Sequence, residues 1–293
     1  GQINQAPARE VGQEVFLLPT SSALSPTEMR NPRSLKLDRL SLSKAVLLMI
    51  EEESKITGAL IKVRRKIERV VGMVVDAFHR GGRLFYVGAG TSGRLGILDA
   101  TECPPTFRTP ADRVQGIIAG GQTAIWSSVE GAEDSPTAGA AAIGYRGVNE
   151  RDVVIGIAAS GRTPFVWGAL RVAKAKGART VLLAFNPHLV IAKENRPDLV
   201  ITPNVGPEVL TGSTRLKAGT ATKIVLNIIT TLAMVRMGKV ISNLMVDLSA
   251  SNVKLRERAV RIVQAVTGAD APAAMAALEE SKWIVKSACQ RLM

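Results

Sequence analysis

The sequence predicts an α/β protein built around a doubly wound parallel sheet. The first observation is a unit repeated in the middle of the chain: a short apolar run, a turn rich in Gly and Ser, then a helical pattern. The second is that these apolar runs are nearly continuous, as expected for strands buried on both faces. The third is that 293 residues, 46% hydrophobic and 22% charged, suit one large globular domain with additions.

Five apolar runs are the candidate strands of this sheet. They cover residues 84–87, 114–119, 153–157, 181–184 and 199–201. Helical patterns follow two of the Gly- and Ser-rich turns, at residues 95–100 and 164–176. Strands that alternate with helices in this way indicate a sheet with helices on both sides.

The segments before the sheet fall into two parts. Residues 1–32 are rich in Pro, Ser, Gln and Asn, and we expect them to form a partly disordered N-terminal arm. From 43 to 79 apolar residues recur at spacings of three and four, which predicts one or two amphipathic helices. Gly81 and Gly82 then end the helical pattern.

After Thr202 a polar loop leads into helical patterns that continue to the last residue. They cover residues 223–237, 252–266 and 272–292. We therefore divide the chain into the arm 1–32, an α/β domain 33–248 and a small C-terminal helical region 249–293.

The charge balance favours an anionic small molecule over a nucleic acid. Lys and Arg number 38 against 25 Asp and Glu, so the net charge is +13. This excess suits a phosphorylated metabolite. Aromatic residues are only 4% and the basic residues are scattered, so the stacking platform of a nucleic acid-binding protein is not indicated.

Cysteine usage and hydropathy indicate a cytoplasmic protein without a metal. Cys103 and Cys289, even with His79 and His188, are too few for a disulfide framework or a zinc site. The longest apolar run, 224–235, is interrupted by polar residues and predicts no membrane helix. The start of the chain lacks the pattern of a signal peptide.

Two turns that join a strand to a helix are candidate phosphate sites. Gly88–Arg94 and Ser160–Thr163 share Ser, Gly, Arg and Thr, and such turns offer N–H groups, hydroxyls and a helix N-terminus to an anion. The first turn also has the G-x-G-x-x-G spacing of a dinucleotide site, but no acidic residue follows at the end of a second strand about 20 residues later. The simpler alternative is that both are only tight turns.

Carboxylates are the candidate acids and bases. Glu102 precedes two prolines at 104–105, which we expect to end the helix and leave Glu102 in a loop at the ligand edge. Glu130, Glu133 and Asp134 follow a Gly-Gly turn, where the alternative is a solvated helix end. Two carboxylates at one substrate can divide the roles of acid and base.

The loop after the last strand is the third candidate region. It carries Glu208, Thr211, Ser213, Thr214, Arg215 and Lys217. These side chains could close over a sugar phosphate, or the loop could simply cap the next helix through Ser213 or Thr214.

Six sequence segments, taken in their order along the chain, resemble those of one protein family. They are GAGTSGRLGILDATECPPTF, IAGG, VEGAED, GIAASGRTPFV, PEVLTGSTRLKAGTATK and NLMVDL. The chain resembles the N-acetylmuramic acid 6-phosphate etherases, which are sugar isomerase (SIS) domain enzymes, from about residue 29 to 290. The family usually continues beyond the point at which this chain stops, so we expect a shortened C-terminal helical region.

The resemblance implies a SIS fold, a cytoplasmic homodimer and no metal or organic cofactor. It also implies the reaction, which cleaves the D-lactyl ether of N-acetylmuramic acid 6-phosphate to N-acetylglucosamine 6-phosphate and D-lactate. Glu102 is then the acid that assists lactate departure and Glu133 the second acid/base, with Glu130 as the alternative. The implied binding residues are Thr91, Ser92, Gly93, Ser160, Gly161, Arg162, Thr163, Glu208, Thr211, Ser213 and Lys217.

Two other functions use the same turns. A sugar-phosphate sensor of the glucokinase regulatory protein type would bind without catalysis and would need neither acid. A sugar isomerase would need a different base, for which Glu208 is the candidate.

Overall fold

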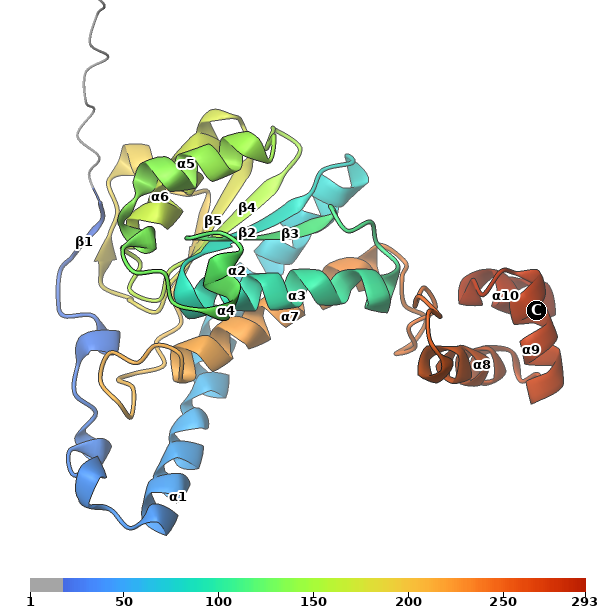
Figure 1. Ribbon diagram of the computed structural model, residues 1–293, viewed down its shortest axis with the longest axis horizontal. Helices are drawn as coiled ribbons and strands as arrows, with labels where there is room; N and C mark the ends of the chain where they lie inside the picture. The colour runs from blue at the N-terminus through green and yellow to red at the C-terminus, as the bar shows by residue number, and fades with distance from the viewer. Residues whose placement is uncertain (1–17) are drawn as a thin grey trace, which may run out of the picture.

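The computed structural model describes residues 18–293, and the parallel sheet that the sequence predicts lies at its centre (Figure 1). Five strands lie in the order β3-β2-β4-β5-β7, and all neighbouring pairs are parallel. They are β2 (Leu84–Gly88), β3 (Val114–Ile118), β4 (Val153–Ile157), β5 (Arg179–Leu183) and β7 (Leu199–Ile201). The strand order reverses direction between β2 and β4, and a crevice for ligands is expected at the carboxyl ends of these two strands.

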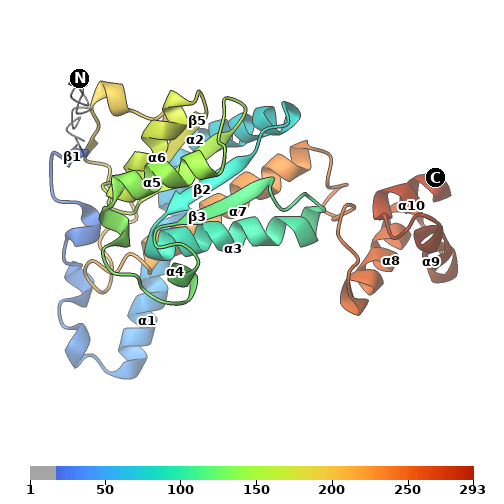
Figure 2. The ribbon, with the colours of Figure 1, turned by 45° about the horizontal axis from the view of Figure 1, so that its top comes forward.

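Helices cover both faces of this sheet (Figure 2). On one face lie α2 (Lys55–His79), α3 (Gly90–Phe107) and α7 (Lys217–Arg236); on the other lie α5 (Pro136–Tyr145) and α6 (Pro164–Ala175). Alternate strand residues supply the two apolar cores: Tyr86 and Ile155 point into the first, Phe85 and Val154 into the second. The strands are therefore buried on both sides, which explains their continuous apolar runs.

The expected helix near 223–237 is α7, and it starts earlier, at Lys217. Its length and a mean hydropathy of 1.5 would suit a membrane span, but 56% of that window is buried inside the protein. It packs against α2 and α3. These contacts make α7 a core helix of the α/β domain.

The helical segment before the sheet forms two helices. They are α1 (Leu42–Glu53) and α2, which are separated at Ser54. Ser41 begins α1, because its hydroxyl accepts a hydrogen bond from the N–H of Lys44 at 3.4 Å. In Figure 1, α1 projects from the body of the domain.

The second half of the expected N-terminal arm packs against the α/β domain. Residues 1–17 of the predicted arm 1–32 lie outside the described residues, but residues 18–32 pack against the α/β domain. The short strand β1 (Thr20–Ser21) pairs with β6 (Leu189–Val190). Three 3₁₀ turns follow: η1 (Pro26–Glu28), η2 (Pro32–Ser34) and η3 (Leu37–Arg39). Polar side chains, Thr27 and Asn31 among them, are buried here, so hydrogen bonds hold a segment that hydropathy alone does not predict.

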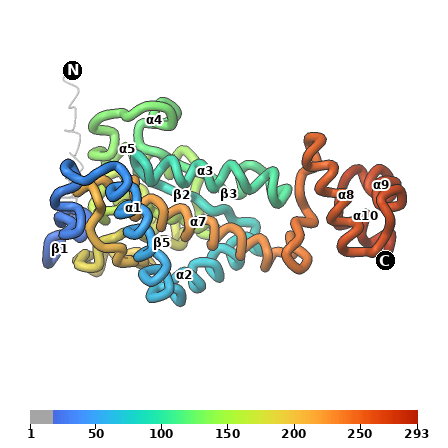
Figure 3. The backbone as a smooth tube through the Cα atoms, turned by 90° about the horizontal axis from the view of Figure 1, so that it is seen from below, coloured from blue at the N-terminus to red at the C-terminus, as the bar shows by residue number. Residues whose placement is uncertain are grey.

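The C-terminal helices stand apart from the sheet, at one end of the molecule (Figure 3). They are α8 (Val253–Thr267), α9 (Ala271–Glu280) and α10 (Val285–Leu292), and they share a separate apolar core. The stretch expected to be helical over 272–292 is broken after α9, where Lys282 and Trp283 adopt positive φ angles of 50° and 60°.

Candidate active site

The two predicted phosphate turns lie side by side. The first follows β2 and opens α3; the second follows β4 and opens α6. Since β2 pairs with β4 over its whole length, both turns open at the reversal point of the sheet. The prediction that they share one edge is confirmed.

Close backbone packing shapes the first turn. A Cβ atom on Gly93 would lie 2.5 Å from Cγ1 of Ile118 and 2.8 Å from the carbonyl oxygen of Gly88. Only glycine fits there, so α3 begins directly against the end of β2. Thr91 and Ser92 stand on the first turn of α3, half-exposed at the helix N-terminus, where an anion is favoured.

Hydrogen bonds hold the second turn. Gly161 has a φ of 77°, and its carbonyl oxygen accepts from Nε1 of the buried Trp167 at 2.8 Å. The hydroxyl of Ser160 accepts from the N–H of Arg162 at 3.2 Å. Thr163 then stands at the start of α6. This turn is therefore fixed before any ligand arrives.

A cavity of about 770 Å³ lies against the second turn. Ser160 and Arg162 form one wall, and residues of the N-terminal segment, among them Ser25 and Glu28, form another. Asn186 also lines the cavity, and its Nδ2 donates to Oγ of Ser21 in the N-terminal segment at 3.2 Å. Sequence reasoning missed this contribution of residues 18–28, because a Pro- and Ser-rich segment carries no periodic signal.

Glu133 lies on a segment that packs against the helix following the second turn. It belongs to the short helix η4 (Ala132–Asp134), which packs against α6, and its side chain is exposed. Arg94 of α3 holds the start of the same segment: its guanidinium donates to the carbonyl oxygens of Ile125 and Ser127 at 3.2 and 3.3 Å. Glu130 accepts from Oγ of Ser128 at 3.3 Å. One candidate carboxylate thus lies on a segment packed against α6, the helix that the second turn opens.

Glu102 does not lie in a loop, and this expectation was wrong. The helix α3 continues through both prolines, which occupy its last turn, and ends at Phe107. The next residue, Arg108, caps it in the left-handed conformation with a φ of 51°. The N–H of Arg108 donates to the carbonyl oxygen of Pro104 at 2.9 Å. Because the prolines stand so near the helix end, the helix tolerates them.

Glu102 instead borders a hollow between α3 and α7. This α3–α7 hollow has a volume of about 330 Å³. Its walls are Leu95, Leu98, Asp99, Glu102, Lys223 and Asn227. It lies away from the strand ends, along the sides of two helices.

Asp99 is the buried acid of this hollow, and sequence reasoning missed it. Its carboxylate accepts from the hydroxyl of Tyr86 at 2.9 Å, from Nδ2 of Asn227 at 2.8 Å and from Oγ1 of Thr230 at 3.2 Å. Burial raises the pKa of Asp99, and the same burial, with the Asp99 charge, raises the pKa of Tyr86. These hydrogen bonds connect α3 to α7 and to β2.

Glu208 and Lys217 make contacts inside the protein. The fully buried carboxylate of Glu208 accepts from the N–H groups of Lys217 and Ala218, both at 3.0 Å, and so caps α7. Burial raises the pKa of Glu208. Nζ of Lys217 donates to Glu52 at 2.8 Å and to the carbonyl oxygen of Pro207 at 2.7 Å. Both side chains hold the loop, and neither faces the cavity at the second turn.

The rest of that loop remains available to a ligand. Thr211 is exposed and Ser213 is half-buried. The N–H of Gly212 between them donates to the carbonyl oxygen of Thr27 at 3.0 Å, which ties this loop to the N-terminal segment.

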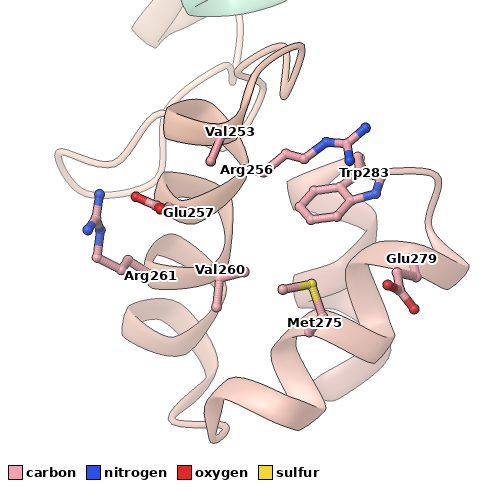
Figure 4. A pocket seen from close by; sticks show the side chains of 8 residues that line it. All are labelled: Val253, Arg256, Glu257, Val260, Arg261, Met275, Glu279 and Trp283. Carbon is pink, nitrogen blue, oxygen red and sulfur yellow. The ribbon is translucent and has the colours of Figure 1, made fainter.

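A further cavity lies in the C-terminal helices. It has a volume of about 570 Å³ and is lined by apolar and charged side chains (Figure 4). Arg256 stands over the ring of Trp283, 4.9 Å from its centre. The cavity lacks the Ser and Gly turns of the strand ends. No cluster of His, Cys, Asp and Glu that could hold a metal ion occurs within residues 18–293.

Two Gly- and Ser-rich turns, each opening a helix at the reversal point of a covered parallel sheet, place the chain in the SIS class of α/β domains. A family model described as the glucokinase regulatory protein N-terminal SIS domain matches residues 63–174. A solved structure from Bacteroides fragilis NCTC 9343, assigned as a phosphosugar isomerase of capsule formation, has a TM-score of 0.51 at 19% identity. It covers 69% of this chain and 95% of its own, and at this identity it shows the fold alone.

Curated relatives are much closer. The N-acetylmuramic acid 6-phosphate etherase of Edwardsiella ictaluri (strain 93-146) is 52% identical over 262 residues, 89% of this chain and 87% of the relative. The etherase of Gloeobacter violaceus (strain ATCC 29082 / PCC 7421) is 53% identical over 262 residues, 89% of this chain and 85% of the relative. The chain belongs to the N-acetylmuramic acid 6-phosphate etherase family.

Proposed function

We propose that the protein is a carbon–oxygen lyase that cleaves the D-lactyl ether of N-acetylmuramic acid 6-phosphate. The products are N-acetylglucosamine 6-phosphate and D-lactate, and the reaction serves cell-wall sugar recycling. The observation that carries this proposal is the 52% identity to a named etherase across 89% of the chain. The protein acts in the cytoplasm as a homodimer.

The two turns hold the phosphate group. Thr91, Ser92 and Gly93 offer the N-terminus of α3, while Ser160 to Thr163 offer a hydroxyl, N–H groups and the Arg162 cation. Thr211 and Ser213 close the pocket from the loop before α7. Glu208 and Lys217 act by positioning that loop, which explains why their polar atoms are engaged with the protein.

The reaction needs an acid and a base near C2 and C3 of the ring-opened sugar. A base removes the C2 proton, which the neighbouring C1 aldehyde acidifies. The electron pair then forms the C2–C3 double bond as the C3–O bond breaks, and an acid protonates the departing lactate oxygen. Water adds to C3 of the unsaturated aldehyde and a proton returns to C2. Glu133 and Glu102 supply these proton transfers.

The decisive experiment measures D-lactate released from N-acetylmuramic acid 6-phosphate by the purified protein, with a chelator and no added cofactor. In ¹⁸O-labelled water, elimination followed by addition places the label at C3 of the sugar. Label in the lactate instead would contradict this route.

The match to the glucokinase regulatory protein domain supports a second candidate, a sensor that binds the sugar phosphate without converting it. Tight binding of the phosphosugar with no lactate release would favour this sensor.

A further inference from the structure

Glu28 of the N-terminal segment brings a carboxylate to the cavity beside the second turn. It lies on η1, lines that cavity and is exposed. Within residues 18–293 its side chain makes no hydrogen bond and no ion pair. Only its backbone is engaged, through an N–H that donates to the carbonyl oxygen of Ser25 at 2.9 Å. Both carboxylate oxygens are therefore available to a ligand in the cavity.

The backbone that carries this carboxylate is held in place. Thr27, the residue before Glu28, is fully buried, and its hydroxyl shares a 2.8 Å hydrogen bond with that of Ser25. The carbonyl oxygen of Thr27 accepts from the N–H of Gly212 at 3.0 Å. Pro26 stands at the start of η1, where its ring restricts φ. Because the segment is fixed before a ligand arrives, a contact with Glu28 costs less conformational entropy.

The same carboxylate lies beside the loop that precedes α7. A Cβ atom on Gly212 would stand 3.7 Å from Oε2 of Glu28, an ordinary van der Waals distance. Thr211 and Ser213 flank Gly212 and are available to a ligand. Glu208 was the carboxylate expected to bind from this loop, but its oxygens cap α7. Glu28 instead presents a free carboxylate where the cavity meets the loop.

The cavity carries opposite charges on its two walls. Ser160 and Arg162 line it from the second turn, and Glu28 lines it from the N-terminal segment. A phosphate is favoured beside Arg162 and repelled by Glu28. A hydroxyl group is favoured beside Glu28, because hydrogen bonds to a charged acceptor are stronger than those to a neutral one. The two walls together suit a ligand that has a phosphate at one end and hydroxyl groups next to it.

The proposed substrate has this pattern when its ring is open. C6 bears the phosphate, and the next two carbons, C5 and C4, each bear a hydroxyl group. An ionised carboxylate has two acceptor oxygens and can accept from both hydroxyl groups at once. In the closed ring the oxygen on C5 is part of the ring and has no hydrogen to donate.

We propose that Glu28 is a sugar-binding residue, whose carboxylate accepts hydrogen bonds from the C4 and C5 hydroxyl groups of the ring-opened substrate. This inference rests on the proposed function for the identity of the sugar phosphate. Since the C5 hydroxyl group exists only in the open chain, the contact favours the form in which the C1 aldehyde is available for elimination. The N-terminal segment thus selects the form of the substrate that reacts.

Binding measurements on Glu28→Gln test this role. The first ligand is N-acetylglucosamine 6-phosphate reduced to its open-chain alcohol, and the second is its methyl glycoside, in which the ring cannot open. Calorimetry should show that the substitution lowers affinity for the alcohol roughly 10- to 150-fold, as expected for loss of a hydrogen bond to a charged group. Affinity for the glycoside should fall less, so the preference of wild type for the alcohol largely disappears.

Inorganic phosphate, the third ligand, separates the hydrogen bond from the charge. Glu28→Gln removes a negative charge near an anion, so the affinity for inorganic phosphate should stay the same or rise. The matched control is Asp38→Asn, which removes an exposed carboxylate from η3, outside the cavity lining. This control should bind all three ligands as wild type does.

Two results would overturn the proposal. One is an unchanged affinity of Glu28→Gln for the open-chain alcohol. The other is an equal loss of affinity for inorganic phosphate, which would show that the substitution disturbs the segment as a whole. Lactate release is measured separately. A wild-type protein that binds the alcohol and releases no lactate would contradict the proposed lyase, while the comparison of affinities would still decide the role of Glu28.

Discussion

Glu52 of α1 and Lys217 of α7 form a 2.8 Å ion pair in which neither side chain is more than 1% exposed. The same carboxylate accepts hydrogen bonds from Asn31 at 2.8 Å, Lys55 at 2.7 Å and Arg33 at 3.0 Å. The pair therefore joins the N-terminal segment, the projecting helix α1 and the start of α7. Burying two charges is costly, and the three further donors make the arrangement favourable.

Glu52→Gln should strongly destabilise the protein. The substitution leaves the Lys217 cation buried without its counter-charge, and loss of one partner of such a pair costs about 3–5 kcal/mol. Urea unfolding measures the change. Glu51→Gln is the matched control, because Glu51 pairs with Arg33 at the surface and its loss should cost about 1 kcal/mol or less. Equal effects of the two substitutions would contradict the importance of the buried pair.

The free energy of unfolding should fall at acidic pH, because the Glu52 carboxylate becomes protonated. Burial alone would raise the pKa of Glu52, but hydrogen bonds from Lys217, Lys55 and Asn31 lower it from 4.5 to about 2. The charged form thus favours the folded state above pH 4.5, and this contribution, on the order of 3 kcal/mol, is lost as the pH falls towards 2.

The pH experiment compares the free energy of unfolding of wild type and Glu52→Gln across that range. The difference between the two proteins should shrink on acidification. The comparison removes the opposite effect of Asp99 and Glu208, whose raised pKa values favour folding at low pH. A constant difference would show that Glu52 does not titrate as expected.

Ser160→Ala should weaken binding of the phosphorylated sugar specifically. A hydrogen bond to a charged phosphate contributes about 1.5–3 kcal/mol, a loss of roughly 10- to 150-fold in affinity. Calorimetry with N-acetylmuramic acid 6-phosphate and with its unphosphorylated form measures both affinities. The second should change little; if both fall equally, the turn does not bind the phosphate.

Glu133→Gln and Glu130→Gln separate the two candidates for the second acid/base. Glu133 lies on η4, which packs against α6, whereas Glu130 accepts a hydrogen bond from Ser128. We expect Glu133→Gln to lower lactate release by about 10²–10⁴-fold and Glu130→Gln to keep most of it. The reverse result would move the role to Glu130.

The sheet and its turns could be predicted because their signals are local. Each strand is a continuous apolar run, and the Gly and Ser groups directly follow two of them, so chain order alone places both turns at one edge. The structure moves the strand ends by only one or two residues, as at 84–87 against Leu84–Gly88.

The features that could not be predicted depend on partners far away in the sequence or on the position of a residue within its helix. The start of α7 depends on the Glu208 carboxylate, which caps it from nine residues upstream. In the sequence, nothing distinguishes Glu52 from a surface acid, because its partner Lys217 lies 165 residues later. The two prolines after Glu102 predict a helix end, but α3 places them in its final turn, where few hydrogen bonds are lost.

The hydrogen bond between Thr27 and Gly212 joins two segments that are synthesised at very different times on the ribosome. Residues 18–31 emerge long before their partners, which lie at Leu189–Val190, Gly212 and Pro207. The wall they add to the cavity at Ser160 can therefore form only after most of the domain has been synthesised. A nascent chain already carries both phosphate turns while that wall is still missing, so an unfinished protein would present an open, weakly selective site.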